Sequence, residues 1–136
     1  MKKFKDLIPG DFIYKIVVPG IILRESDFPT IEKLKIVRVS DKSVHYLLED
    51  SSIEVNLFFG EDGDKDCIND TGYFYGFFSN LNAVNKKYLS VCEEFLSECF
   101  KSVEETEKKL IKHLKICMTL TEYIENIKNN KLWKNF

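Results

Sequence analysis

The acidic segment between residues 60 and 72 holds the side chains best suited to binding a metal ion. Asp62, Asp64 and Asp66 stand at alternate positions, which is the spacing of the first three oxygen ligands in a calcium-binding loop. Such a loop continues with glycine at its sixth position and glutamate at its twelfth, where this chain has cysteine and tyrosine. We therefore expect a solvated hairpin loop here, with a weak divalent-cation site as the alternative.

Histidine and cysteine are the residues that could support nucleophilic or acid-base catalysis. The chain has two histidines, His45 and His113, and four cysteines: Cys67, Cys92, Cys99 and Cys117. The cysteines form no CxxC pair, no family signature surrounds any serine or cysteine, and the glycines form no phosphate-binding motif. The sequence thus predicts reduced thiols, no catalytic residue and no cofactor, and we expect a chain that is not an enzyme.

Lysines cluster in the C-terminal half of the sequence. Lys108, Lys112 and Lys115 recur at helical spacing and would share one face of a helix. A basic face of this kind can hold phosphates or an anionic partner. The alternative is an ordinary solvated face on which the nearby glutamates form ion pairs at i, i+4 spacing, and this alternative is the one we favour.

Aromatic residues are unusually abundant, with eleven phenylalanines and six tyrosines. In the run from residue 73 to 78, strand alternation would place Tyr73, Tyr75 and Phe77 on one face, and both faces would be apolar. One face would line the interior of a small domain. The other face would be covered either by helices of the same chain or by another protein.

The N-terminal half, residues 1–78, reads as strands separated by turns. Five short runs are rich in β-branched and aromatic residues or alternate between apolar and polar positions: residues 12–18, 31–39, 44–49, 53–59 and 73–78. Five strands are too few for a two-sheet sandwich. We therefore predict a small antiparallel β-barrel whose closure removes exposed strand edges.

A Pro-Gly-Asp turn opens the first of these strands. The segment Leu7-Ile8-Pro9-Gly10-Asp11-Phe12-Ile13-Tyr14 resembles the opening of SH3-like small barrels. The resemblance covers eight residues and implies a fold without implying an activity.

The period of the apolar pattern changes at Ser79, which we predict to be a helix N-cap. Apolar residues then recur at helical spacing as far as residue 127, and no glycine or proline follows Gly76. One helix over residues 80–128 would be about 70 Å long, and its apolar stripe would need a partner chain. The alternative is a helical hairpin that turns near residues 101–103, where a capping-box spacing occurs. We favour the hairpin, because the stripe is broader than a coiled-coil seam.

These patterns divide the chain into a barrel (1–78), a helical segment (79–128) and a tail (129–136). The tail contains Trp133, the only tryptophan, and ends on Phe136. Both side chains could dock on the domain or anchor a partner.

Composition limits the class of function. The formal net charge is −2, whereas proteins that act by neutralising phosphates are usually basic, so a nucleic-acid partner is not expected. The chain shows no signal peptide and no apolar run of membrane-spanning length, which favours a cytoplasmic location and no membrane partner. Ala83 is the only alanine and glutamine is absent, as codon bias in an AT-rich bacterium or phage would produce.

Three hypotheses follow for the function. The first is a non-catalytic binding or adaptor protein, such as a phage or mobile-element accessory or counter-defence factor. It would act through contact with another protein, through self-association of the C-terminal helices, or by sequestering a ligand. The second is a nucleic-acid-binding small barrel with a basic groove formed by Lys33, Lys35 and Arg38 together with residues 108–115. The third is a small enzyme whose site is not visible in the sequence.

Overall fold

The computed structural model describes residues 1–48 and 51–129, which form an α+β structure, as predicted. The strands are β1 (Phe12–Val17), β2 (Thr30–Val39), β3 (Ser43–Leu47), β4 (Glu54–Phe58), β5 (Cys67–Asp70) and β6 (Tyr75–Phe78). A single-turn 3-10 helix, η1 (Phe4–Asp6), precedes β1, and a second, η2 (Gly60–Asp62), lies between β4 and β5. The α-helix α1 (Leu81–Asn129) follows β6.

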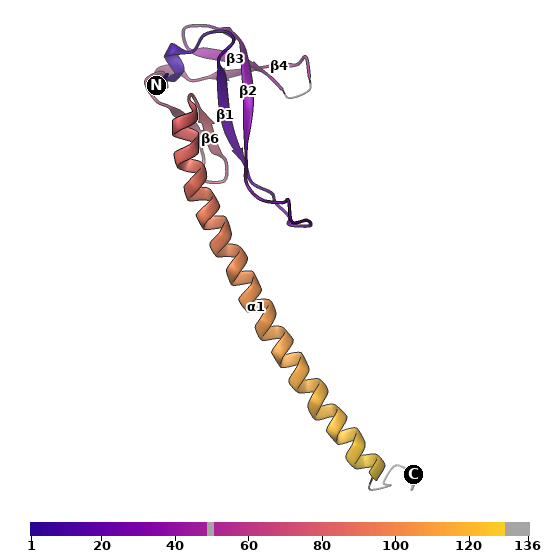
Figure 1. Ribbon diagram of the computed structural model, residues 1–136. Coiled ribbons are helices and arrows are strands. Elements are labelled where there is room, and N and C mark those ends of the chain that lie inside the picture. The colour runs from indigo at the N-terminus through magenta and orange to yellow at the C-terminus, as the bar shows by residue number, and fades with distance from the viewer. Residues whose placement is uncertain (49–50, 130–136) are drawn as a thin grey trace. The chain divides into compact units, whose positions relative to one another are not determined.

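All six strands belong to one antiparallel sheet in the order β4-β3-β2-β1-β6-β5, which curls into a half-barrel (Figure 1). The long hairpin of β1 and β2 is its centre, with Phe12 opposite Lys35 and Val17 opposite Thr30. In the described part of the chain, β4 and β5 are the two edges of this sheet. The predicted closure of the barrel by strand pairing is therefore not found.

The sixth strand, β5, lies inside the segment that we expected to be a loop. Its residues Cys67 and Ile68 pair with Phe78 and Phe77 of β6. Asn69 and Asp70 follow Ile68 in β5, and both residue types are depleted in strands. The sequence pattern therefore does not predict a strand here. Ile68 is nevertheless buried, and its burial in the core explains why this polar segment joins the sheet.

The concave side of the sheet encloses the larger hydrophobic core. Alternation along the central strands points Ile13 of β1 and Leu34 and Ile36 of β2 inward, and all three are at most 1% exposed. Phe4 of η1 closes one end of this core and packs its ring 6.1 Å from that of Phe59. The other buried members of the cluster are Leu7, Val44, Tyr46, Leu57 and Ile68.

A second, smaller core lies between the sheet and the first turns of α1. Val84 and Val91 of the helix pack with Ile16 of β1 and Phe78 of β6. The Tyr88 hydroxyl donates a hydrogen bond to the Pro29 carbonyl at 2.6 Å, which ties the helix to the start of β2. The chain's own helix thus covers this face of the sheet, as one of the two alternatives predicted.

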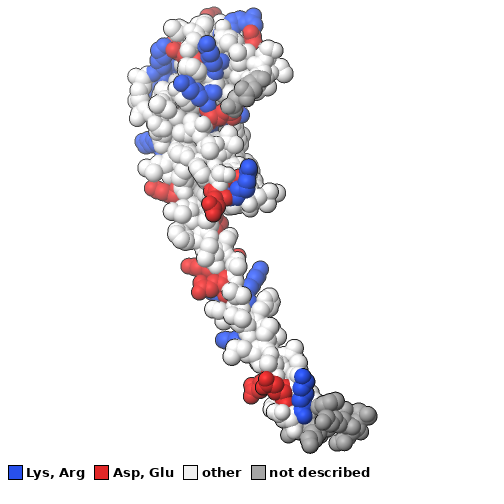
Figure 2. All heavy atoms as spheres, turned by 45° about the vertical axis from the view of Figure 1, so that its right-hand side comes forward, with Lys and Arg blue, Asp and Glu red and all other residues white. Residues whose placement is uncertain are grey.

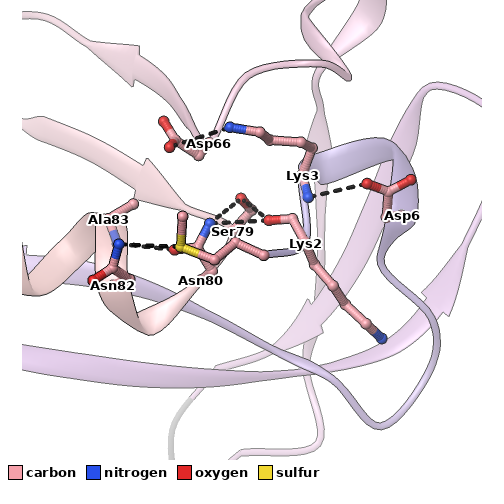
Figure 3. Close-up of polar contacts among 9 residues, drawn as sticks. Lys2, Lys3, Asp6, Asp66, Ser79, Asn80, Asn82 and Ala83 are labelled. Atoms are coloured by element: carbon pink, nitrogen blue, oxygen red, sulfur yellow. Dashed lines mark hydrogen bonds and ion pairs between the residues drawn. The ribbon is translucent and has the colours of Figure 1, made fainter.

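The start of α1 is fixed by polar contacts with the N-terminal segment (Figure 3). Asn80 is the N-cap, because its side-chain oxygen accepts a hydrogen bond from the Ala83 backbone N–H at 2.8 Å. Ser79, which we predicted to be the cap, instead donates its buried hydroxyl to the Lys2 carbonyl at 2.8 Å. Asn80 also donates to that carbonyl, at 3.0 Å. The cap therefore lies one residue later than predicted.

The helix runs without interruption through residues 101–103, so the hairpin that we favoured is wrong. Ser102, the expected start of a second helix, accepts a hydrogen bond on its carbonyl from the Thr106 hydroxyl, as happens inside a helix. The chain divides into two compact units, Met1–Phe95 and Leu96–Phe136. The first turns of α1 belong to the unit that contains the sheet, and the following turns form the second.

Candidate functional site

The second unit exposes a large apolar surface on α1. Between Leu96 and Ile124, eleven large apolar side chains are 43–71% exposed. They are Leu96, Phe100, Val103, Leu110, Ile111, Leu114, Ile116, Met118, Leu120, Tyr123 and Ile124. The two helix residues that are buried, Val84 and Val91, both lie in the first unit. We call the eleven exposed side chains the apolar face of α1.

A seven-residue repeat runs along the middle of this face. Leu96, Val103, Leu110, Cys117 and Ile124 stand seven residues apart, close to two helical turns, so they form one column along the helix. We call these five residues the central column. A repeat of this kind is the pattern that lets one helix pack along another.

Two shallow hollows on α1 have the form of the holes that receive side chains in helix packing. The first is lined by Val103, Thr106, Glu107 and Leu110, with Ser102 at its rim. Positions i, i+3, i+4 and i+7 of one helix are the four corners of such a hole. The second hollow has the same spacing, with Ile116, Thr119, Leu120 and Tyr123, and Lys115 beside them, but it lies between the central column and the polar side of the helix.

Polar residues occupy the other side of the same helix. Lys112, Lys115, Thr119, Glu122 and Asn126 recur every three or four residues, and all are exposed. Thr119 lies nine residues, or two and a half turns, beyond Leu110, which places it on the opposite side from the central column. Figure 2 shows charged groups separated by broad uncharged surface along this half of the chain.

The predicted basic residues Lys108, Lys112 and Lys115 are exposed and lie together on this polar side. They belong to a longer division of charge along the helix. Residues 98–107 carry four glutamates and one lysine, whereas residues 108–115 carry four lysines and no carboxylate. In the first of these segments, Lys101 forms an ion pair with Glu98 at 3.3 Å.

The predicted aromatic surface is divided among three environments. Tyr73 is fully exposed before β6 begins. Tyr75 is half-buried against the smaller core, where Lys87 lies 5.2 Å from its ring centroid. Phe77 packs into the larger core, with its ring 5.7 Å from that of Tyr46.

The prediction that Tyr75 and Phe77 share a face is therefore wrong, and Gly76 gives the reason. Its φ of +87° is outside the strand region, and Asn69, one residue beyond Ile68 in β5, also has a positive φ. This local break in the strand sends the two aromatic side chains to different cores. Trp133 and Phe136, the other predicted anchors, lie outside the described residues.

The acidic loop uses its carboxylates in separate ion pairs with lysines. Asp62 pairs with Lys65 at 3.2 Å, Asp66 pairs with Lys3 at 3.4 Å, and Asp64 pairs with Lys5. The hydrogen bond and the positive charge of Lys5 lower the pKa of Asp64. Within residues 1–48 and 51–129, no group of three or more His, Cys, Asp or Glu side chains is placed to hold a metal ion.

The two histidines lie in different units. His45 of β3 is half-buried, with its Nδ1 4.0 Å from a Glu54 carboxylate oxygen. The same carboxylate pairs with Arg38 of β2. His113 is exposed on α1. Within residues 1–48 and 51–129, no hydrogen bond joins either histidine to a serine, threonine or cysteine side chain.

The cysteines are free thiols in different settings. Burial raises the pKa of the Cys67 thiol, and nearby Asp70 and Asp66 raise it further. Its sulfur lies 3.5 Å from the Tyr75 carbonyl oxygen. A raised pKa keeps the thiol protonated and unreactive near neutral pH. Cys99 is half-buried on α1, and Cys117 is exposed within the central column.

The basic groove that we predicted is present only in part. Lys33 and Lys35 of β2 line a shallow hollow with Phe12 of β1, and the Lys33 ammonium lies 3.9 Å from the centroid of the Phe12 ring. Arg38 does not line this hollow and pairs with Glu54 instead.

An exposed apolar loop between β1 and β2 was missed from the sequence. Ile21, Ile22 and Leu23 are 72%, 55% and 82% exposed, and Phe28 is 50% exposed. The Asp27 carboxylate holds this loop by accepting hydrogen bonds from the backbone N–H groups of Leu23 and Arg24. The signal in the sequence is the apolar run Ile21-Ile22-Leu23 directly after Pro19-Gly20.

No helix in the described residues is both long and apolar enough to span a membrane. Comparisons with protein-family models, with curated proteins and with solved structures find no match to this chain.

Proposed function

We propose that this chain is a non-catalytic protein-binding protein and that the apolar face of α1 is its contact surface. One observation carries the proposal, namely the eleven large apolar side chains that stay 43–71% exposed along one segment of helix. Contiguous apolar surface on this scale marks interaction sites in proteins, whereas single exposed apolar residues do not.

The energy available from covering this surface is large. Burying an exposed leucine or isoleucine side chain fully stabilises by about 1.5–3 kcal/mol. A side chain that is already half covered therefore contributes about 1 kcal/mol, and covering the eleven contributes about 10 kcal/mol. This amount is comparable to the cost of bringing two proteins together, about 4–15 kcal/mol. A partner that covered most of this surface and also packed well could therefore be held stably.

The segment also needs a partner for its own structure. An isolated helix gains little from intrinsic propensity and is stabilised mainly by packing of its apolar face. In the first unit, Val84 and Val91 supply that packing. From Leu96 onward the described side chains are exposed or, at Cys99 and Ile127, half-buried. A protein bound along the apolar face would supply the missing packing.

The carboxylates and the thiol that could take part in catalysis have surroundings that support a non-catalytic role. The carboxylates of the acidic loop are paired with lysines, and the Cys67 thiol has a raised pKa. The lysines occupy the carboxylates, and the raised pKa keeps the thiol protonated near neutral pH.

The test is photo-crosslinking in the cells that produce the protein. A photoreactive phenylalanine replaces Leu110 in the central column or, as a matched control, Asn126 on the polar side. We expect a discrete protein adduct from position 110, with its composition read by mass spectrometry, and a yield at least tenfold lower from position 126. Equal yields from the two positions, or no protein adduct from position 110, would contradict the proposal.

A further inference from the structure

We infer that the edge strand β4 is a self-association site, at which the β4 strands of two copies of this chain pair antiparallel. The site belongs to the first unit, whereas the apolar face of α1 belongs to the second. The inference therefore goes beyond the proposed function and does not depend on it.

The hydrogen bonds to β3 show which backbone groups of β4 face its neighbour. At one end of this ladder, Leu48 donates its backbone N–H to the Ile53 carbonyl at 3.1 Å. At the other end, Phe59 donates its backbone N–H to the Lys42 carbonyl at 2.9 Å. Hydrogen-bonded pairs alternate along an antiparallel ladder, so the odd-numbered residues of β4 direct their backbone groups toward β3.

The even-numbered residues of β4 direct their backbone groups the other way. They are Glu54, Asn56 and Phe58, and β4 is an edge strand in the described part of the chain (Figure 1). Within residues 1–48 and 51–129, no hydrogen bond involves the backbone N–H groups of these three residues. A row of unpaired N–H and C=O groups on a sheet edge binds the backbone of another extended strand.

The opposite edge of the sheet, β5, is protected against such pairing. It has four residues, ends at the charged Asp70, and contains Asn69 with a φ of +61°. Short length, charge and local bends are the features that block pairing at natural sheet edges. Within Glu54–Phe58 there is no proline, no lysine and no positive φ. β4 is therefore the edge of this sheet that is open to a further strand.

A second copy fits this edge in one register. Antiparallel pairing about a two-fold axis at Asn56 sets Asn56 of each copy opposite its equivalent and Glu54 opposite Phe58 of the other copy. All three outward-facing residues of each copy then exchange backbone hydrogen bonds with the other. An axis at residue 55 or 57 leaves one of them without a partner in the other β4.

The side chains agree with this register on both sides of the sheet. On the concave side, the half-buried Val55 lies opposite the buried Leu57 of the second copy, which is an apolar cross-strand pair. On the convex side, Glu54 lies opposite the exposed Phe58, so no like charges face each other. The second β4 is already extended and held by its own β3, so pairing avoids the ordering cost of a flexible peptide. A second copy is therefore the occupant that this edge favours.

The position of Asn56 on the two-fold axis allows a direct test in the full-length chain. In Asn56→Cys, the introduced thiols lie on directly opposed residues, whose Cα atoms are about 5.5 Å apart, and a short bismaleimide joins them. Lys35→Cys is the matched control, because Lys35 is exposed on the same side of the sheet but lies on the inner strand β2. We expect a covalent dimer linked from residue 56 to residue 56, as mapped by mass spectrometry. Its yield should be at least tenfold higher than that of the 35–35 link.

Opposite charges at residue 56 give an independent test. Asn56→Lys and Asn56→Glu each set like charges across the axis, which should weaken association about fivefold in sedimentation experiments. An equimolar mixture of the two variants should form the mixed dimer in preference to either homodimer, as read by native mass spectrometry. Residue 56 is exposed, so neither substitution should unfold the chain, and circular dichroism checks this.

Three results would overturn the inference. Equal yields of the 56–56 and 35–35 links would show that β4 is not a preferred contact. A mixture of the charge variants without enrichment of the mixed dimer would show that residue 56 does not face its equivalent. Links through Cys99 or Cys117 in the absence of 56–56 links would place self-association on α1 instead.

Discussion

The two units of this chain use apolar residues in opposite ways. In residues 1–95, the sheet and the first turns of α1 bury side chains such as Ile13, Ile36 and Val84 completely. In the second unit, residues of the same types, such as Leu110 and Ile116, remain more than half exposed. The first unit therefore provides its own packing, whereas the described residues of the second form an amphipathic helix whose large apolar side chains are exposed.

The largest expected effect comes from making the exposed apolar face of α1 polar. Leu110→Lys with Leu114→Lys should weaken binding at the apolar face at least about 20-fold, because covering the exposed half of two leucines contributes about 2 kcal/mol and each 1.4 kcal/mol is tenfold. The yield of protein adducts from a photoreactive residue at Val103 measures the change. The control, Thr119→Lys with Asn126→Lys, places the same charges on the polar side. Equal effects of the two variants would contradict the contact surface.

The first unit should respond to loss of a buried side chain and not to loss of an exposed one. Ile13 is 0% exposed and Val17 of the same strand is 43% exposed. Ile13→Ala should lower the free energy of unfolding of this unit by about 3 kcal/mol, whereas Val17→Ala should change it by less than about 0.5 kcal/mol. Denaturant unfolding measures both. Association through α1 should be unchanged in either variant, and its loss with Ile13→Ala would show that the two units depend on each other.

Substitution of Gly76 tests whether the backbone break in β6 separates Tyr75 from Phe77. Its φ is +87°, and an added Cβ would clash with the Ile68 carbonyl oxygen. Gly76→Ala should therefore destabilise the first unit by about 2 kcal/mol. Gly20→Ala is the control, because no atom lies within 4 Å of the added Cβ at that position. Similar melting temperatures for the two variants would argue against the strained turn.

Removal of the helix N-cap should have a smaller effect on the free energy of unfolding. Asn80→Ala removes the acceptor for the Ala83 N–H and should lower the free energy of unfolding by about 1 kcal/mol. Asn82→Ala, two residues later in the helix, leaves the cap intact and should have little effect. If Ser79→Ala but not Asn80→Ala reduced helix content, the cap would be Ser79, as the sequence suggested.

The smallest expected effect is a pH dependence at Asp11. The hydrogen bond from Lys2 lowers the pKa of this carboxyl in the folded state. Its stabilising contribution is therefore complete above its pKa in the unfolded chain, near 3.9, and is lost as pH falls through the lower, folded pKa. Unfolding curves between about pH 2 and 6 should show this loss in the native chain and not in Asp11→Asn. Identical pH profiles would contradict it.

Much of the fold could be predicted because its signals are local and periodic. Leu34 and Ile36 alternate with lysines, and that alternation marks β2 with its buried face. The helical period after Ser79, with no glycine or proline to break it, marks α1. The apolar stripe, and its need for a partner if the helix were single, were also visible in the spacing.

The features that were missed depend on contacts between distant segments. β5 forms because Ile68 enters the core, although asparagine and aspartate around it are poor strand residues. Ser79 has the chemistry of a cap, but its hydroxyl is used by the Lys2 carbonyl. The choice between one helix and a hairpin depends on whether tertiary packing favours a turn at residues 101–103, which spacing alone does not decide.

The measurement that tests the central claim most directly is hydrogen exchange of the full-length protein in solution, read by mass spectrometry at several concentrations. If the apolar face is covered by self-association, amides between residues 100 and 124 should exchange slowly at high concentration and faster on dilution, while those of β1 and β2 stay protected throughout. Rapid exchange of residues 100–124 at every concentration, from a chain that remains at 15.9 kDa, would contradict self-association through α1.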